Sequence, residues 1–151
     1  MKGQRLGGPT ALPTESLRRL AWFRYRVRRF MRFSERVARS MGITPQQHQL
    51  LLGVAGYTGR GWATISELAE FLQGRHNAVV GLVQRAADRG LVRKVQGEKD
   101  RRYVKVHLTR KGSAILDEIS RKNITELRTL QIEITKTRQS RPRDIPAAQG
   151  T

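Results

Sequence analysis

Two short runs of side chains in this sequence have the chemistry to bind a nucleic acid. The first is Arg75-His76-Asn77. Arginine can form two hydrogen bonds with guanine and asparagine two with adenine, each pair contributing roughly 1–3 kcal/mol of discrimination. The second is Lys99-Asp100-Arg101-Arg102, whose cations suit the negative potential of a minor groove and whose Asp100 can hold an arginine pointing outward. Alternatively, the first run caps a helix or bonds phosphates, and the second is an ordinary charged turn.

The elements that must position these runs lie between residues 64 and 108. Thr64 and Glu67 form a T-x-x-E capping box, which is typical of a helix start. A second capping box, Thr44 with Gln47, predicts the start of another helix upstream. Gly74 is expected to make the turn after the helix that begins at Thr64, because glycine carries no side-chain penalty there. A second helix then continues to a terminating glycine, Gly90. Its predicted buried side consists of Val79, Leu82, Val83 and Ala86.

A charged hairpin is predicted after the second helix. Apolar and polar residues alternate along residues 104–108, as in a half-buried strand, and Trp62-Ala63 can add a short strand beside it. This order predicts a winged helix-turn-helix, whose second helix enters the major groove. Gly81 lies within that helix, where glycine costs about 1 kcal/mol relative to alanine. Close approach of the backbone to DNA and close helix packing would explain it equally well.

Two long helices are predicted at the ends of the chain. Apolar residues recur three or four positions apart from Leu17 to Met41, and a near-heptad stripe containing Asn123 runs from Leu116 to Ile134. The second stripe is longer than the central lobe needs, so both end helices are expected to form a dimerisation layer. The expected fold class is therefore mainly α (α+β), a winged helix-turn-helix with terminal dimerisation helices. Asn123 would set the register of that layer, or would merely be tolerated in it.

The predicted organisation is a single folded domain with an extension at each end. The ranges are a flexible arm at 1–13, a domain at 14–137 with dimerisation helices at 14–41 and 113–137 and a DNA-binding lobe at 42–112, and a disordered tail at 138–151. The two extensions are assigned from their Gly and Pro content and their lack of apolar periodicity.

The first long helix lies in a strongly basic segment. Residues 1–40 hold 11 basic and 2 acidic side chains, a net charge of +9. One interpretation is a solvated basic face on an otherwise packed helix, and a second is that some arginines lie along DNA phosphates. A third is an amphipathic helix lying on a membrane. The winged helix downstream argues against a membrane as the main partner.

Composition narrows the class of function. The 151-residue chain has a formal net charge of +18, which favours a polyanionic partner, and no cysteine, which excludes disulfides and Cys-ligated zinc. His48, His76 and His107 lack metal-ligand spacing, and no catalytic triad, phosphate loop or paired carboxylate stands out. We therefore expect no metal, no cofactor and no enzymatic activity. Without an apolar signal segment or a run of about 18 apolar residues, the expected location is the cytoplasm, on the nucleoid.

The motifs together resemble a known family. The runs GITPQQHQLLLGV, TISELAEFLQ, RHNAVVGLVQRAADRGLVRK and EKDRRYVKVHLTRKG resemble the multiple-antibiotic-resistance regulator (MarR) family over about residues 14–137. The resemblance implies a homodimer that represses transcription from palindromic operators and, in many members, leaves DNA when a small phenolic or other aromatic ligand binds. It assigns Arg75 to Gln84 to the major-groove helix. It also matches Asp100 and Arg102 to the wing D-x-R motif, with Arg102 as the minor-groove arginine.

Two features depart from the family pattern. Ala86-Ala87 stand where a leucine and a polar residue are usual, which suggests looser packing of the second helix. The C-terminal region is also short for two further helices, so one long helix is expected there.

Three functions remain open at this point. The leading hypothesis is a sequence-specific, dimeric transcription repressor, whose partners are double-stranded DNA, a second copy of the chain and a small aromatic effector. The runner-up is a non-specific nucleic-acid-binding protein, architectural or ribosome-associated. The third is a winged helix used for protein contacts, against which the net +8 over residues 75–111 (11 basic, 3 acidic) argues. The ratio of specific to non-specific affinity separates the first two, because a sequence-specific protein typically binds its site about 10³–10⁷ times more tightly than other DNA.

Overall fold

The computed structural model describes residues 11–139, with side chains as far as residue 131. The elements are α1 (Thr14–Ser40), α2 (Pro45–Leu52), a π-helical turn η1 (Gly53–Tyr57), β1 (Trp62–Thr64), α3 (Ile65–Leu72), α4 (His76–Asp88), β2 (Val92–Gln96), β3 (Val104–Leu108) and α5 (Arg110–Gln139). The predicted fold class, mainly α with a winged helix-turn-helix, is confirmed. Residues 1–10 of the predicted arm (1–13) and residues 140–151 of the predicted tail (138–151) lie outside the described residues.

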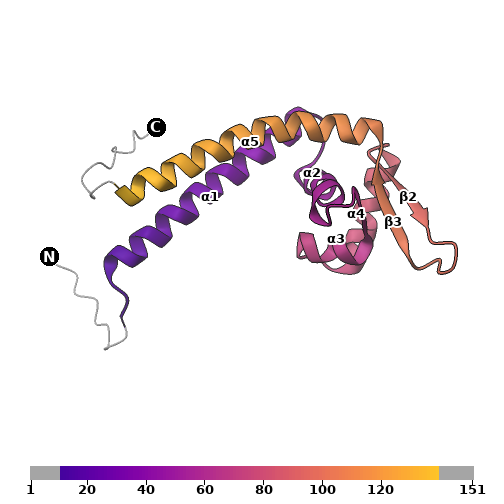
Figure 1. Cartoon of the computed structure of the whole chain (residues 1–151), viewed down its shortest axis with the longest axis horizontal. Helices are drawn as coiled ribbons and strands as arrows, with labels where there is room; N and C mark the ends of the chain where they lie inside the picture. The colour runs from indigo at the N-terminus through magenta and orange to yellow at the C-terminus, as the bar shows by residue number, and fades with distance from the viewer. Residues whose placement is uncertain (1–10, 140–151) are drawn as a thin grey trace.

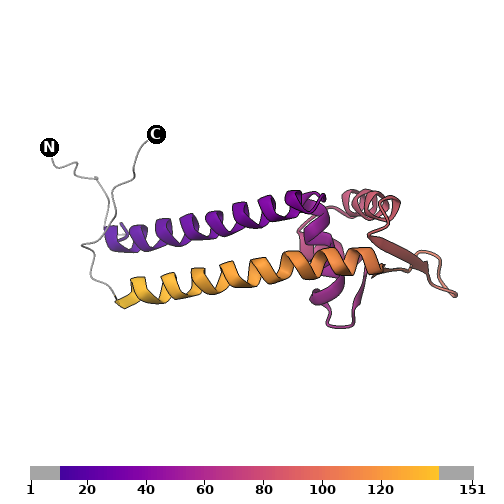
Figure 2. The ribbon, with the colours of Figure 1, turned by 90° about the horizontal axis from the view of Figure 1, so that it is seen from above.

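The long helices α1 and α5 run antiparallel and project together from a small lobe formed by the elements between them (Figure 1). Seen from above, the pair extends away from the β2–β3 hairpin, with the start of α1 and the end of α5 at the far end (Figure 2). Helix α5 is continuous from Arg110 to Gln139, so it begins within the predicted lobe and includes the first two residues of the predicted tail. One helix therefore belongs to both the lobe and the projecting pair.

Both predicted capping boxes are present. The Thr64 hydroxyl accepts a hydrogen bond from the Glu67 amide at 3.3 Å, and the Glu67 carboxylate accepts one from the Thr64 amide at 2.8 Å. Thr44 and Gln47 make the same reciprocal pair at the start of α2, with both distances 3.1 Å. These caps satisfy amides that the first turn of each helix leaves without a partner.

The turn between α3 and α4 differs from the prediction. Gln73, and not Gly74, adopts the left-handed conformation, with φ of 53°. The Gln73 amide donates to the Glu70 carbonyl and the Gly74 amide donates to the Ala69 carbonyl at 2.9 Å, so the last carbonyls of α3 are satisfied. This pattern places the left-handed residue one position earlier than the glycine. Gly56 lies within η1.

The sheet has three antiparallel strands in the order β1-β3-β2. Trp62 lies opposite His107 and Val92 opposite Leu108, so the short strand predicted at Trp62-Ala63 is confirmed. The Thr109 hydroxyl accepts a hydrogen bond from the Gly112 amide at 3.0 Å and caps α5 directly after β3. The wing is therefore tied at its base to the first turn of a long helix.

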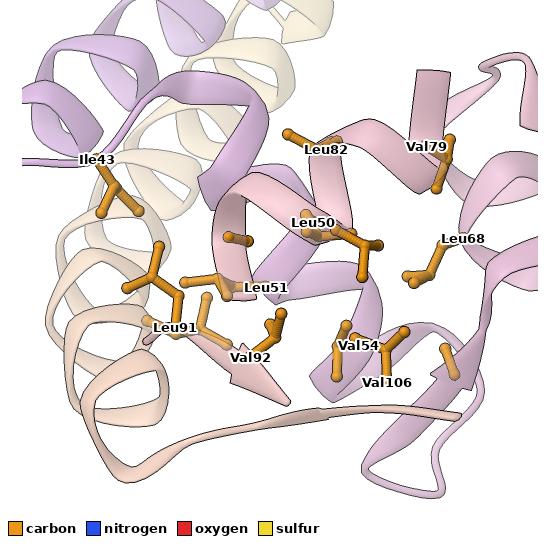
Figure 3. Packing of buried hydrophobic residues seen from close by; sticks show 14 of the residues in the cluster. Ile43, Leu50, Leu51, Val54, Leu68, Val79, Leu82, Leu91, Val92 and Val106 are labelled. Carbon is orange, nitrogen blue, oxygen red and sulfur yellow. The ribbon is translucent and has the colours of Figure 1, made fainter. Parts of the chain in front are cut away.

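The core of the lobe lies where α2, α3, α4 and the sheet meet (Figure 3). Its fully buried residues include Leu50, Leu51, Val54, Leu68, Val83, Ala86, Leu91, Val106 and Ile119. The predicted buried side of α4 is confirmed, because Val79, Leu82, Val83 and Ala86 are all buried. Ala86 is completely inaccessible, so the position where the family usually has a leucine is still part of the core.

Polar contacts also join α1 to α5. The Asn123 side-chain amide donates to the Ser34 hydroxyl at 3.0 Å. This residue, predicted either to set the register of the dimer layer or merely to be tolerated in it, thus makes its hydrogen bond within the chain. In the same predicted seam, Leu116 and Ile119 are buried in the lobe core. Farther along the pair, large apolar side chains are exposed: Leu20, Phe23, Val27, Met31, Ile124 and Leu127. No helix of residues 11–139 is long and apolar enough to cross a membrane.

Candidate nucleic-acid interface

Helix α4 presents one apolar face to the core and one polar face to solvent. Arg75 occupies the N-cap position, and the Val79 amide donates to its carbonyl at 3.1 Å. Its side chain makes no capping hydrogen bond, so the capping alternative does not apply to the guanidinium. Arg75, His76 and Asn77 are all exposed at the start of the helix. The structure therefore places the first predicted run where side chains at a helix N-terminus can reach a groove.

Gly81 lies on the exposed side of α4 together with Asn77 and Gln84, because residues three and four apart share one helix face. A methyl group added at Gly81 would meet only the flexible end of Arg85, with its Nη1 atom 3.2 Å away. Close helix packing, one of the two predicted reasons for this glycine, is therefore not supported. The position is open to an approaching molecule.

Gln84 connects the recognition helix to the wing. Its side-chain amide donates to the Asp88 carboxylate at 2.8 Å, and its carbonyl oxygen accepts a hydrogen bond from the Lys94 ammonium on β2. All three side chains are exposed. In this arrangement Gln84 joins α4 to the hairpin. The family resemblance had assigned it only to the DNA-contacting residues.

The wing tip orients one of its cations. Asp100 accepts two hydrogen bonds from Arg102, one from the backbone amide at 3.0 Å and one from Nε at 3.3 Å. The Arg102 side chain is nevertheless 93% exposed. Lys99 and Arg101 are also exposed beside it. The predicted orienting role of Asp100 is therefore present in the geometry, with the Arg102 guanidinium held outward.

A glycine shapes the turn that carries these cations. The Gly97 amide donates to the Tyr103 carbonyl at 2.7 Å, which closes the end of the hairpin. A Cβ atom at Gly97 would lie 2.8 Å from the Asp100 carbonyl oxygen, closer than real contacts of this kind. The absence of a side chain at Gly97 therefore allows the backbone of Asp100 to pack closely against residue 97 in the turn.

Arg89, just past the end of α4, was not identified from the sequence. Its guanidinium donates to the Gln47 side-chain oxygen at 3.1 Å and to the Gly42 carbonyl at 2.6 Å. The Lys111 ammonium donates to the Arg89 carbonyl at 2.9 Å. The end of the recognition helix is thereby attached to the α1–α2 connection and to the start of α5. No local pattern marks this residue, because its partners are 42 and 47 residues away along the chain.

The described residues place no metal-binding cluster near the interface. Nowhere between residues 11 and 139 do three or more His, Cys, Asp or Glu side chains gather closely enough to hold an ion. The exposed face of α4 and the wing tip therefore offer amides, a histidine and cations. These groups are suited to hydrogen-bonding base edges and to binding phosphates.

One family model matches part of the chain. Residues 41–102, from the end of α1 to the wing tip, match the family model of the MarR family. This segment of the chain is similar to the MarR family. The matched segment contains α3, α4 and the start of the β2–β3 hairpin, which carry both runs predicted to bind nucleic acid. No curated protein matches the chain.

Solved structures of MarR-family proteins share the fold. AbsC, a MarR family transcriptional regulator from Streptomyces coelicolor, is 19% identical with a TM-score of 0.66, over 87% of this chain and 84% of that one. A mutant MarR from E. coli complexed with operator DNA is 22% identical with a TM-score of 0.60, over 85% and 87%. BpsR of Bordetella bronchiseptica, whose DNA binding is regulated by 6-hydroxynicotinic acid, is 18% identical with a TM-score of 0.55, over 76% and 81%.

Proposed function

We propose that this chain is a regulator of the MarR type, a homodimeric repressor that reads a palindromic operator with α4 and holds it with the wing. The observation that carries the proposal is the outward-held Arg102 at the wing tip, combined with the exposed Arg75, His76 and Asn77 at the start of α4. In this assignment Asn77 and Arg75 contact base edges and Arg102 enters the minor groove. Lys99 and Arg101 bind the flanking phosphates, and Gly81 allows the helix backbone to approach DNA.

The proposed dimer explains the exposed apolar side chains of the projecting helices. Leu20, Phe23 and Val27 on α1 and Ile124 and Leu127 on α5 are exposed in the single chain. Contiguous exposed apolar residues of this kind usually mark an interaction surface. A second copy packed there would form a two-fold dimer, and a two-fold dimer carries two recognition helices related by the same symmetry as a palindromic operator.

The proposed effector site is a surface hollow between the projecting helices and the lobe. The hollow has a volume of about 680 Å³, and its lining includes Glu35, Arg39, Ile43, Pro45 and Arg89. Arg89 also anchors the end of α4 to the α1–α2 connection. A small aromatic acid bound there would compete for this arginine and alter the tilt of α4. This is the route by which we propose that a ligand releases DNA, as the likeness to the ligand-regulated BpsR supports.

Selection of bound sequences from a random duplex pool tests the proposal. We expect an enriched motif with two inverted half-sites about one helical turn apart, and protection of that motif in a footprint. Replacing Asn77 by Ala should relax the sequence preference at one position of each half-site. Recovery of no motif, with steeply salt-dependent binding to every duplex, would support the non-specific nucleic-acid-binding alternative.

A further inference from the structure

Helix α1 carries an excess of one type of cation. Its 27 residues include nine arginines, no lysine and two glutamates. Arginine has a planar, delocalised guanidinium that binds phosphate through two parallel hydrogen bonds, whereas lysine acts as a point charge. The recognition helix and the wing, which the proposed function already uses, do not include any of these residues.

Helical geometry gathers most of these arginines on one side of α1. With about 3.6 residues per turn, six of them form a stripe, here called the arginine face: Arg18, Arg28, Arg29, Arg32, Arg36 and Arg39. The opposite side of the helix carries Ser34, which bonds to Asn123 of α5, and Val37 and Ala38, which are buried in the core. Arg28, Arg32 and Arg36 lie away from these contacts, whereas Arg39 borders the lobe and Arg29 borders α5.

Three members of the arginine face are free to bind a ligand. Arg28, Arg32 and Arg36 are exposed, and no carboxylate of a residue that the structure describes forms an ion pair with them. The two glutamates of α1 lie instead beside Arg18, at 3.9 Å, and Arg39, at 4.0 Å. Glu35 also lies on this face, three residues after Arg32, but its ion pair is with Arg39. The charges of Arg28, Arg32 and Arg36 are therefore not neutralised by a direct ion pair among the described residues.

Aromatic rings lie beside Arg29 of the arginine face. The Arg29 guanidinium lies 5.9 Å from the centroid of the Tyr25 ring, and Tyr25 packs edge-to-face on Trp22 with ring centroids 5.4 Å apart. Such contacts restrict a long side chain and leave its outer edge available. Arginine interleaved with exposed aromatic rings is a composition suited to nucleic-acid binding.

We propose that the arginine face of α1 is a second DNA-binding surface, which holds backbone phosphates without reading sequence. From Arg18 to Arg39 it extends roughly 31 Å at about 1.5 Å per residue, close to the roughly 34 Å of one turn of duplex DNA. A helix that lies on a membrane buries apolar residues flanked by cations. The only aliphatic residue of this stripe is the small Ala21, which favours a polyanion with regularly spaced charges.

The surface stays accessible under the proposed dimer. The exposed apolar residues Leu20, Phe23 and Val27 lie on a different side of α1 from Arg28 and Arg32. A partner that covers them therefore leaves the arginine face open. Because the projecting pair leads away from the hairpin (Figures 1 and 2), the arginine face contacts DNA outside the base pairs that α4 and the wing read.

The test compares two triple variants of the full chain that lose equal charge. The face variant is Arg28→Gln, Arg32→Gln, Arg36→Gln, and the control variant replaces three exposed arginines off the face: Arg19→Gln, Arg121→Gln, Arg128→Gln. Binding to a random-sequence duplex is measured by fluorescence anisotropy at several salt concentrations. Each lost phosphate contact reduces the steepness of the plot of log K against log salt concentration by about 0.9. The steepness should therefore fall by about 2.7 in the face variant and by much less in the control variant. Circular dichroism and light scattering establish that both variants keep their fold and oligomeric state.

Three results would overturn the inference. Equal changes in both variants would mean that only the total charge matters. Loss of binding to phosphatidylserine vesicles without loss of duplex binding would assign the stripe to a membrane. A larger loss on single-stranded RNA than on duplex DNA would assign it to RNA. The inference does not depend on the proposed operator, because the face variant should weaken binding to operator and random duplexes equally and leave their ratio unchanged.

Discussion

Asp100 and Arg102 form a closed unit at the tip of the wing, with the carboxylate accepting hydrogen bonds from both the backbone amide and the Nε atom of the arginine. The contact restricts the arginine without covering it, since 93% of its side chain remains exposed. An acidic residue at a DNA-binding surface would ordinarily repel phosphates. Here its effect on side-chain orientation is expected to exceed its repulsion.

Replacing Asp100 by Ala should therefore weaken DNA binding, by about tenfold, although it removes a negative charge. The reason is that ordering a free arginine side chain on binding costs about 1–2 kcal/mol, and about 1.4 kcal/mol corresponds to tenfold. Glu98→Ala is the matched control, because it removes a tip carboxylate that has no hydrogen bond to Arg102. If both variants bind more tightly than the parent protein, charge governs the wing and the orienting role is wrong.

Replacing Gly81 by Ala should increase the stability of the protein and weaken its binding to DNA. Alanine is favoured over glycine in a helix by about 1 kcal/mol, and its methyl group would meet only the movable Arg85 guanidinium. We expect a higher melting temperature together with weaker operator binding, because the methyl group would stand between α4 and DNA. Melting curves and binding isotherms of the same preparation measure both effects. Unchanged affinity would show that the α4 backbone does not approach DNA at this point.

Replacing Gly112 by Ala should destabilise the lobe, by about 3 kcal/mol or more. A Cβ atom there would lie 2.0 Å from the Leu91 carbonyl oxygen, so either α5 or the strand that follows α4 must move. Gly56→Ala is the control, because no heavy atom lies within 4 Å of the corresponding position. Urea unfolding of both variants gives the two free energies. Equal stability of the two would contradict the close contact between α5 and Leu91.

The stability of the protein should fall as the pH drops from about 7.5 to about 5.5. Burial lowers the pKa of His48 below its ordinary value of 6.5, and burial, followed by the charges of Arg93 and Lys105, lowers the pKa of His107. The unfolded chain then binds more protons than the folded chain in this range. The stabilisation from the neutral histidines is therefore complete above about pH 7.5 and is lost as the pH falls through the lowered pKa values of the folded state.

Denaturant unfolding at a series of pH values tests this linkage. His48→Gln and His107→Gln should each reduce the slope of stability against pH, and the double variant should reduce it further. A parent protein whose free energy of unfolding is constant between about pH 7.5 and about 5.5 would contradict the assigned directions.

Much of the lobe is predictable from the sequence because the signals are local. The reciprocal pairs Thr44 with Gln47 and Thr64 with Glu67 are three residues apart and start their helices as predicted. The alternation along β3 and the cations of the wing tip are equally local. The left-handed residue is harder to place, because the helix end, and not the glycine alone, determines that Gln73 takes this conformation.

The contacts that join the elements were not predictable from local patterns. Lys94 bonds to Gln84 across ten residues, Arg89 to Gly42 across 47, and Asn123 to Ser34 across 89. Each depends on the relative placement of two elements, which a pattern within one segment does not contain. Asn123 in particular lies at a position of the heptad-like stripe that suits a subunit interface, and only the packing of α1 on α5 within the chain assigns it a different partner.

The affinity ratio between two duplexes of equal length tests the central claim most directly. One duplex carries the upstream region of the gene that encodes the protein, or the motif recovered by selection, and the other is a scrambled version, both at the same stated salt concentration. A sequence-specific dimeric regulator should prefer the first by about a thousandfold or more, with two subunits bound per duplex. Equal affinity for both, with a steep dependence on salt, would contradict base reading by α4 and the wing.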